Sequence, residues 1–330
     1  MTDDPTKTAW HEEAALPFQV PSLDLRGRLV RLGPSLDAML EKHNYPPPVG
    51  ELLAEAMMLA ATLATSIKYD GIFTLQIRGD GPVRLLVTDV TSAGQMRGYA
   101  QFDRPSLEAA LAKDAPSISP VPRLLGAGTL AFTVDQGPDT ERYQGVVSLE
   151  GATLADCAQG YFRQSEQLKT GLRLAVARNA DGNGAGDGSD GQRAHWRGAA
   201  LMIQRLPGEL TPDGFSDDSD EADDRWRRAV ILLSTTTDKE MLDGKLPAEN
   251  LLYRLYHEEG VRASPPRHLE FGCRCSRHRI ENVLRSFPKA EIADLKDERG
   301  AIVVTCEFCL TDYRFSDAEV EALWAEKDKA

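Results

Sequence analysis

The stretch that decides the fold of the C-terminal region begins with Cys273-Arg-Cys275 and continues, thirty residues later, with Cys306-Glu-Phe-Cys309. Two close cysteine pairs at this separation are typical of a zinc site, because each pair presents two thiolates to one metal. Four sulfurs complete a closed tetrahedral shell, which leaves no position for a catalytic water. The first pair has one spacer residue, where most zinc modules have two. We therefore predict a structural or redox-active site rather than a hydrolytic one.

The size of the C-terminal segment supports the same interpretation. About 65 residues follow Pro265-Pro266, and modules of this size usually need a metal or disulfides to supplement a small core. The fifth cysteine, Cys157, lies in an apolar helical pattern and is predicted to be a buried core thiol. We expect one Zn²⁺ per chain in the reduced protein, with the ligands Cys273, Cys275, Cys306 and Cys309.

Composition places the chain among globular proteins. It has 330 residues, 42% of them hydrophobic, and its 51 acidic and 38 basic side chains give a net charge of -13. This balance disfavours general binding to nucleic acid and favours solubility. The N-terminus lacks the pattern of a secretory signal, and no apolar run approaches the ~20 residues of a membrane helix. We expect a cytoplasmic protein without a membrane partner, in which paired cysteines bind metal or sense redox state.

The pattern of strands and helices favours an α+β fold, because the strands cluster without regular alternation with helices. Alternating apolar residues predict strands at 23–32, 72–78, 83–88, 96–102, 129–134, 143–149, 172–177 and 199–204, and helical periodicity predicts helices at 35–43, 51–67, 105–112 and 152–168. This mixed core is expected over residues 1–207. Residues 1–18 are interpreted as a mobile extension, and the Gly/Asp-rich residues 179–196 as a flexible loop.

A second region, 208–262, combines an acidic linker with amphipathic helices. Residues 209–224 are acidic and carry Pro and Gly, as domain linkers do. Helices are predicted at 225–234, 239–242 and 248–257. The zinc-binding domain is then expected over residues 263–330.

Several segments from about Phe18 onward resemble a known family, the 33-kilodalton redox-regulated heat-shock chaperones. The combination of CxC and CxxC with this gap is highly specific to that family. The remaining segments that carry the resemblance are Leu52-Leu-Ala-Glu-Ala, Lys68-Tyr-Asp-Gly, Leu75-Gln-Ile-Arg-Gly-Asp-Gly-Pro-Val-Arg-Leu-Leu-Val, Tyr161-Phe-Arg-Gln-Ser-Glu-Gln-Leu-Lys-Thr, Leu252-Tyr-Arg-Leu-Tyr-His-Glu-Glu and Phe271-Gly-Cys-Arg-Cys-Ser-Arg.

The resemblance implies an ATP-independent holdase, not an enzyme, with a metastable helical linker and a C-terminal zinc switch. It implies that oxidants form the disulfides Cys273–Cys275 and Cys306–Cys309 and expel zinc. The linker and zinc domain would then unfold, and the active protein, often a homodimer, would capture unfolded clients. Two features depart from the family pattern: the Gly/Asp loop and N-terminal extension are long, and Leu310 stands where a glycine is common.

Physical chemistry supports such a switch independently. A structural zinc ion can supply roughly 10–16 kcal/mol of apparent folding free energy by joining two distant pairs. A disulfide within one pair closes a very small loop and constrains the unfolded chain little. Oxidation within the pairs would therefore remove the long-range crosslink, and the domain should unfold.

Client capture requires apolar surface that the resting protein conceals. The helical region at 225–257 offers two apolar stripes of this kind, and the acidic residues before it would keep an opened form soluble. The predicted client-binding residues are Val230, Ile231, Leu232, Leu251, Leu252, Tyr253 and Leu255.

Parts of the sequence also suggest two other functions. A zinc-ribbon protein that binds nucleic acid is suggested by the basic residues around the first cysteine pair, although the chain as a whole is acidic. A thiol-disulfide oxidoreductase is suggested by Cys306-Glu-Phe-Cys309, although the strand–helix context of thioredoxin-like motifs is missing.

Overall fold

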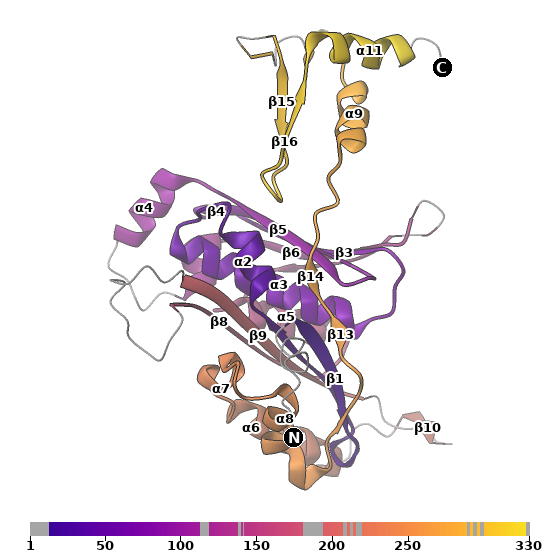
Figure 1. Ribbon diagram of the computed structural model, residues 1–330. Coiled ribbons are helices and arrows are strands. Elements are labelled where there is room, and N and C mark those ends of the chain that lie inside the picture. Colours follow the sequence, from indigo (N-terminus) through magenta and orange to yellow (C-terminus); the bar gives the residue numbers. More distant parts are fainter. Residues whose placement is uncertain are drawn as a thin grey trace, which may run out of the picture. The chain divides into compact units, whose positions relative to one another are not determined.

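The computed structural model describes residues 13–112, 119–137, 140, 142–180, 194–206, 210–211, 214–215, 220–288, 291–292, 296–297 and 300–327. The chain divides into two compact units, Met1–Phe271 and Gly272–Ala330. The first unit contains two sheets, one antiparallel and one mixed, with helices between and beside them, and the second is a small unit around one hairpin (Figure 1). The predicted α+β class is confirmed.

Sheet A of the first unit is buried on both faces. Its strand order is β12 (Arg262–Ala263), β1 (Ala14–Val20), β2 (Leu25–Leu32), β9 (Ala194–Arg205) and β8 (Thr170–Ala180), and β13 (Arg267–His268) also pairs with β1. Side chains alternate along each strand. In β2, Leu25 and Leu29 pack on one face against the helices of the segment 220–256, whereas Val30 and Leu32 face the main core on the other side.

Sheet B contains the hairpin predicted from the alternation at 72–88, and β3 pairs antiparallel with β4 in the structure. Its strand order is β14 (Glu270–Phe271), β5 (Gln95–Phe102), β4 (Val83–Thr91), β3 (Ile72–Gly79), β6 (Gly128–Asp135) and β7 (Tyr143–Ser148). The helices of this part are α2 (Pro34–Leu40), α3 (Pro47–Ser66), α4 (Arg104–Ala112) and α5 (Leu154–Gln164), with short helical turns at Pro21–Leu23 and Val121–Leu125.

Helix α3 forms the centre of the main core. Its residues from Val49 to Thr65 are nearly all buried, as the broad apolar circumference predicted. Among the residues described here, α3 alone is long and apolar enough to cross a membrane, and 83% of its most apolar window is buried inside the protein.

The interpretation of residues 1–18 as a mobile extension is wrong for its last part. Residues 14–18 belong to β1, where Phe18 is 1% exposed and lies between partner strands on both sides. Glu13 Oε1 accepts hydrogen bonds from the backbone N–H groups of Gly33 and Ser35, at 2.8 and 3.1 Å, and so caps α2. The alternation of Leu16, Phe18 and Val20 indicates a strand, but Pro17 obscures this pattern because proline is unusual within strands. Residues 1–12 lie outside the described residues.

The flexible loop at 179–196 is also narrower than predicted. Asn179 and Ala180 continue β8, and residues 194–196 begin β9, where Trp196 is buried. The strands extend further because each residue of one finds a partner in the other, from Thr170–Gln204 to Ala180–Ala194. Residues 181–193 lie outside the described residues.

The linker helices pack on the outer face of sheet A. They are α6 (Asp220–Ser234), α7 (Asp238–Leu242) and α8 (Ala248–Tyr256), followed by a turn at His257–Glu259. Helix α6 begins five residues earlier than predicted at 225, because Asp220, Glu221 and Asp223 favour a helix N-terminus. A two-stranded ribbon, β10 (Leu210–Thr211) with β11 (Gly214–Phe215), precedes them; most of the acidic stretch 209–219 lies outside the described residues.

The division between the two compact units falls after Phe271, nine residues beyond the domain start that we predicted at 263. Residues 262–271 are held by the first unit, since β12 and β13 pair with β1, and β14 pairs in parallel with β5. These short strands have no pattern of their own, and their pairing depends on edges that only the folded sheets provide.

The second unit has a very small core. It contains α9 (Arg277–Ser286), β15 (Ile302–Thr305), β16 (Asp312–Phe315) and α11 (Asp317–Lys327), with β15 antiparallel to β16. The buried apolar side chains of its core, among the described residues, are Leu284, Ile292, Ile302, Phe315, Val320 and Leu323. A core of this size is of the kind that usually needs a metal or disulfides to supplement it.

Candidate metal centre

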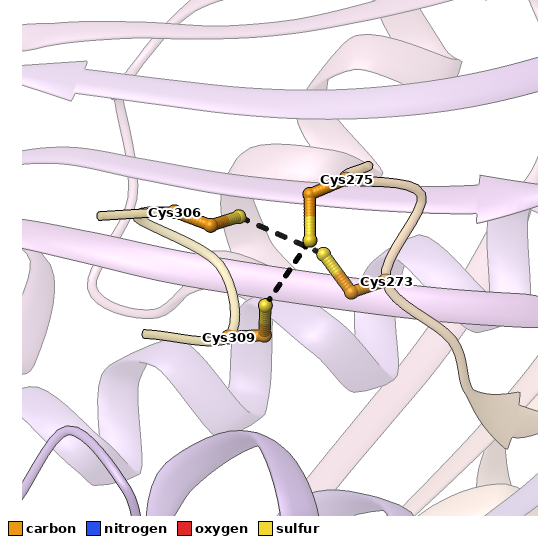
Figure 2. Close-up of side chains that lie close together, drawn as sticks. All are labelled: Cys273, Cys275, Cys306 and Cys309. Atoms are coloured by element: carbon orange, nitrogen blue, oxygen red, sulfur yellow. Dashed lines mark hydrogen bonds between the residues drawn. The ribbon is translucent and has the colours of Figure 1, made fainter. Parts of the chain in front are cut away.

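Two loops bring the paired cysteines together. Cys273 and Cys275 lie between β14 and α9, and Ser276 caps that helix by accepting a hydrogen bond from the Arg279 N–H. Cys306 and Cys309 lie in the turn between β15 and β16. All four sulfurs point toward one point in Figure 2, and each lies within 4.8 Å of the others.

The distances between the sulfurs fit a four-sulfur metal site. Cys273 Sγ lies 3.7 Å from Cys306 Sγ, and Cys275 Sγ lies 3.4 Å from Cys309 Sγ. A tetrahedron with Zn–S bonds of about 2.3 Å has sulfurs about 3.8 Å apart. A disulfide would require about 2.05 Å, and all five cysteines of the chain are thiols here. The four residues therefore suit Zn²⁺.

The turn that carries the second pair depends on one unusual backbone conformation. Leu310 has φ +54°, in the left-handed region that glycine adopts most easily. This conformation lets the Leu310 N–H donate to Cys306 O at 2.8 Å and the Cys306 N–H donate to Thr311 O at 3.0 Å. Leu310 therefore keeps the turn but adds local strain.

Thiol acidity differs among the cysteines. Burial raises the pKa of Cys275 to about 12, against the opposing effect of the Tyr313 hydroxyl, which donates to its sulfur at 3.1 Å. Burial also raises the pKa of Cys306. Burial acts the same way on Cys309, but hydrogen bonds with the side chain and backbone of Thr311 outweigh it and lower the pKa to about 7. A divalent cation would favour ionisation of all four thiols.

Part of the basic surface near the first pair is engaged within the unit. Arg277 donates to Arg314 O at 2.9 Å, pairs with Glu319 at 2.7 Å and lies over the Phe315 ring, 4.3 Å from its centroid. Arg279 donates to Arg274 O at 2.9 Å. These arginines therefore contribute to the fold of the second unit, which weakens the case for a nucleic-acid surface.

A second group of metal-ligating side chains, Asp37, Glu41 and His195, lies in the first unit. Asp37 Oδ2 is 2.8 Å from His195 Nδ1, and Asp37 Oδ1 accepts from the Trp196 N–H at 2.6 Å. These bonds fasten α2 to the start of β9, so a structural role accounts for Asp37.

The predicted client-binding residues fall into two sets. Leu251, Leu252 and Leu255 are at most 4% exposed and pack against sheet A. Ile231, Tyr253 and Val230 are 55%, 63% and 36% exposed, and Leu232 is intermediate. The apolar faces of α6 and α8 therefore pack against sheet A, and only the side chains at the edges of these faces are accessible.

Sequence reasoning missed Arg31, which fastens the linker helices. Arg31 is 6% exposed on β2, and its guanidinium donates to the backbone carbonyls of Glu240 at 3.0 Å, Leu246 at 2.5 Å and Asp243 at 3.3 Å. In the sequence, this role was indicated by a charged residue within the predicted strand at 23–32. Its carbonyl partners could not be read from the sequence.

Comparison with known proteins identifies the family. The family model described as Hsp33 protein matches residues 13–316. The chain belongs to the Hsp33 family. It is 41% identical over 315 residues to a protein named 33 kDa chaperonin from Caulobacter vibrioides, covering 95% of this chain and 98% of that one. A protein of the same name from Pseudomonas fluorescens is 39% identical over 303 residues, covering 92% of this chain and 90% of that one.

A solved structure agrees with the fold of this Hsp33-family chain. The crystal structure of the 33 kDa chaperonin (heat shock protein 33 homolog) from Thermotoga maritima superposes with a TM-score of 0.73 and covers 97% of this chain and all of that one. At 21% identity, this likeness supports the fold alone. Family membership makes the chain a chaperone, and unfolded proteins are the partners that a chaperone binds.

Proposed function

We propose that this chain is an ATP-independent holdase, not an enzyme, that oxidation activates through its C-terminal metal centre. The observation that carries the proposal is the convergence of four sulfurs from two pairs thirty residues apart. Cys273, Cys275, Cys306 and Cys309 would hold Zn²⁺ in the reduced protein. The metal would supply a crosslink between the loop before α9 and the β15–β16 hairpin.

Oxidation would exchange this long-range crosslink for two short ones. In each pair, two thiols would lose two electrons and two protons to one hydrogen peroxide, giving one disulfide and two waters. The products would be Cys273–Cys275 and Cys306–Cys309, with release of Zn²⁺. Neither disulfide connects the two loops, and the apolar core of the second unit is only a few side chains. The second unit should therefore unfold.

The linker helices would supply the client-binding surface. Their docked faces bury Ala229, Leu233, Leu251, Leu252 and Tyr256 against sheet A. Release of these helices would expose that apolar area, including the buried Leu251, Leu252 and Leu255 beside the accessible Ile231 and Tyr253. We further propose that the protein works in the cytoplasm and that the oxidised form is a homodimer.

The decisive experiment measures zinc content, disulfide connectivity and suppression of client aggregation on the same samples before and after peroxide treatment. We expect one zinc per chain and little activity in reduced protein, and no zinc, both short disulfides and strong activity after oxidation. Mainly Cys275–Cys306 bridges in the active form would contradict the mechanism, because they would keep the two loops connected. Reduction of client disulfides by catalytic amounts of protein would favour an oxidoreductase instead.

A further inference from the structure

The linker region contains two buried hydroxyl groups that form no hydrogen bond. Tyr256, at the end of α8, is 0% exposed, and Thr236, in the turn between α6 and α7, is 1% exposed. Neither side-chain oxygen has a hydrogen-bond partner. In the described part of the chain, the one other buried hydroxyl without a partner is that of Thr88. Unpaired hydroxyls are therefore concentrated in the region that the proposed switch has to release.

Tyr256 is held in its position by its ring. The ring stacks on Phe18 of β1, with centroids 5.9 Å apart and planes at 28°, and belongs to the apolar cluster between α8 and sheet A. Burial alone raises the pKa of its hydroxyl, without a contribution from any charged or hydrogen-bonding neighbour. A phenylalanine ring can make the same contacts. The hydroxyl therefore adds nothing to docking and loses its hydration in apolar surroundings.

Thr236 lies in a turn that is held against sheet A. Arg173 of β8 donates to the carbonyl oxygen of Ser234 at 3.3 Å and pairs with Asp238 at 2.8 Å, so it binds the chain on both sides of Thr236. The Thr236 N–H donates to Leu233 O at 3.1 Å, whereas its Oγ1 is enclosed without a partner. A valine side chain has the same shape and would fill this space without a polar atom.

The main core provides partners for its hydroxyls. In α3, the Oγ1 atoms of Thr62 and Thr65 donate to carbonyl oxygens one turn earlier, at 2.7 and 2.8 Å. The half-buried Tyr69 donates its hydroxyl to Val90 O at 3.0 Å. Apart from Thr88, no hydroxyl in the described part of the main core is both buried and unpaired. Hydroxyls are thus paired where the structure is expected to stay folded.

We propose that the hydroxyls of Tyr256 and Thr236 set how easily the linker helices leave sheet A. In the docked state each hydroxyl is buried and unpaired, and in the released state each is hydrated, so each one favours release. The apolar faces of α6 and α8 act in the opposite direction and favour docking. The inference rests on the proposed function, in which release of these helices creates the client surface, and it names two atoms that control that release.

Hydrogen exchange in reduced, zinc-loaded, full-length protein tests this proposal without oxidation. Tyr256→Phe and Thr236→Val each remove one hydroxyl and keep the shape of the side chain. Each should lower the opening equilibrium of residues 238–256 about 5- to 50-fold, because a buried, unpaired polar group is removed. Tyr253→Phe is the matched control on α8, since that ring is 63% exposed, and it should leave this exchange unchanged. Exchange in the core strands at 72–90 should be the same in all variants.

Oxidation of the same variants separates the linker from the metal centre. After peroxide treatment, Tyr256→Phe should release zinc and form both disulfides at the natural rate, but client capture should appear more slowly, because fewer molecules release the linker.

Unchanged exchange at 238–256 in both Tyr256→Phe and Thr236→Val would overturn the proposal, because it would show that the hydroxyls are paired in the docked state. Faster exchange would also overturn it, since the hydroxyls would then hold the helices in place. Slower exchange in a protein that oxidation fails to activate would leave this inference standing and refute only the proposed redox switch.

Discussion

Leu310 is the residue at which the metal centre stores backbone strain. It occupies the left-handed region at φ +54°, and its side chain is 40% exposed, so it gains little from burial in return. A left-handed conformation costs an ordinary residue about 1–2 kcal/mol. Glycine adopts it without that cost, although it also loses more freedom on folding.

Leu310→Gly should therefore stabilise the zinc-bound second unit by about 1 kcal/mol. Since metal binding and folding of this unit are coupled, zinc affinity should rise about 5-fold in competition with a chelator. Leu310→Ala is the matched control, because it removes the side chain and keeps the strain. Equal affinities for the two variants would show that the turn is not strained.

The four clustered cysteines should each be necessary for zinc, and the remote thiol should not. Cys309→Ser should lose the metal, because three sulfurs leave an open shell. Cys157→Ser should retain one zinc per chain, since Cys157 is buried in the main core. The zinc content of each variant, measured after gel filtration, tests this assignment of the ligands. Metal retained by Cys309→Ser and lost by Cys157→Ser would contradict the assignment.

Individual helices and one strand hold the linker region against sheet A. Helices α6, α7 and α8 pack their apolar faces on sheet A, and Arg31 of β2 adds three hydrogen bonds to backbone carbonyls at 240, 243 and 246. These carbonyls lie in α7 and the segment that follows it, so one side chain fixes the segment between two helices. Hydrogen bonds from a charged donor are stronger than neutral ones.

Arg31→Met should loosen this docking by on the order of 3 kcal/mol, because the three carbonyls lose a buried charged donor. We expect faster hydrogen exchange at 238–256 and partial client capture without oxidation. Arg28→Met is the control on the same strand: its guanidinium donates to Thr65 O and Gly27 O, away from the linker. Similar exchange at 238–256 in both variants would remove Arg31 from the switch.

Helix α3 carries a pH-sensitive group. Burial, and to a lesser degree the neighbouring Glu51, raises the pKa of the Glu55 carboxyl from 4.5 to about 7. The folded protein therefore holds a proton that the unfolded chain releases, so Glu55 reduces stability as pH rises from about 4.5 to 7. Glu55→Gln should match the natural protein at pH 4.5 and exceed its stability by up to about 3 kcal/mol at pH 8.

Urea unfolding of the core at both pH values measures this difference. Glu108→Gln, on the exposed face of α4, should show no such pH dependence. An equal difference at pH 4.5 and pH 8 would show that ionisation of Glu55 is not involved.

At the scale of the whole molecule, the two units have very different cores. The first unit has one large core around α3 and a second beneath the linker helices, whereas the second unit has a core of a few side chains. Loss of metal should consequently unfold the second unit first and leave the main core intact.

Hydrogen exchange should reveal this order. In oxidised, active protein we expect a sharp acceleration at 225–257 and little change in the core strands at 72–90. Replacing Ile231 and Leu232 with Asp should open the linker before oxidation and weaken client capture afterwards. Exchange at 225–257 that is the same in reduced and active protein would refute the coupling between zinc and linker.

The sequence by itself determined those features that depend on local pattern. The cysteine spacing predicted which four residues cluster, alternation at 72–88 predicted the β3–β4 hairpin, and the broad apolar circumference predicted the buried helix α3. Such patterns repeat within one element, and they remain visible when the partner is unknown.

Only the tertiary structure decided which surfaces meet. It placed 14–18 in β1, attached residues 262–271 to the first unit and directed Arg31 to three carbonyls more than two hundred residues away. It also assembled a cavity of about 460 Å³ in the first unit from seven separate elements, α3, α5, β2, β3, β6, β7 and β9. The physical reason is that edge pairing, buried hydrogen bonds and cavities depend on partners distant in sequence, and no local pattern records a partner that folding alone brings near.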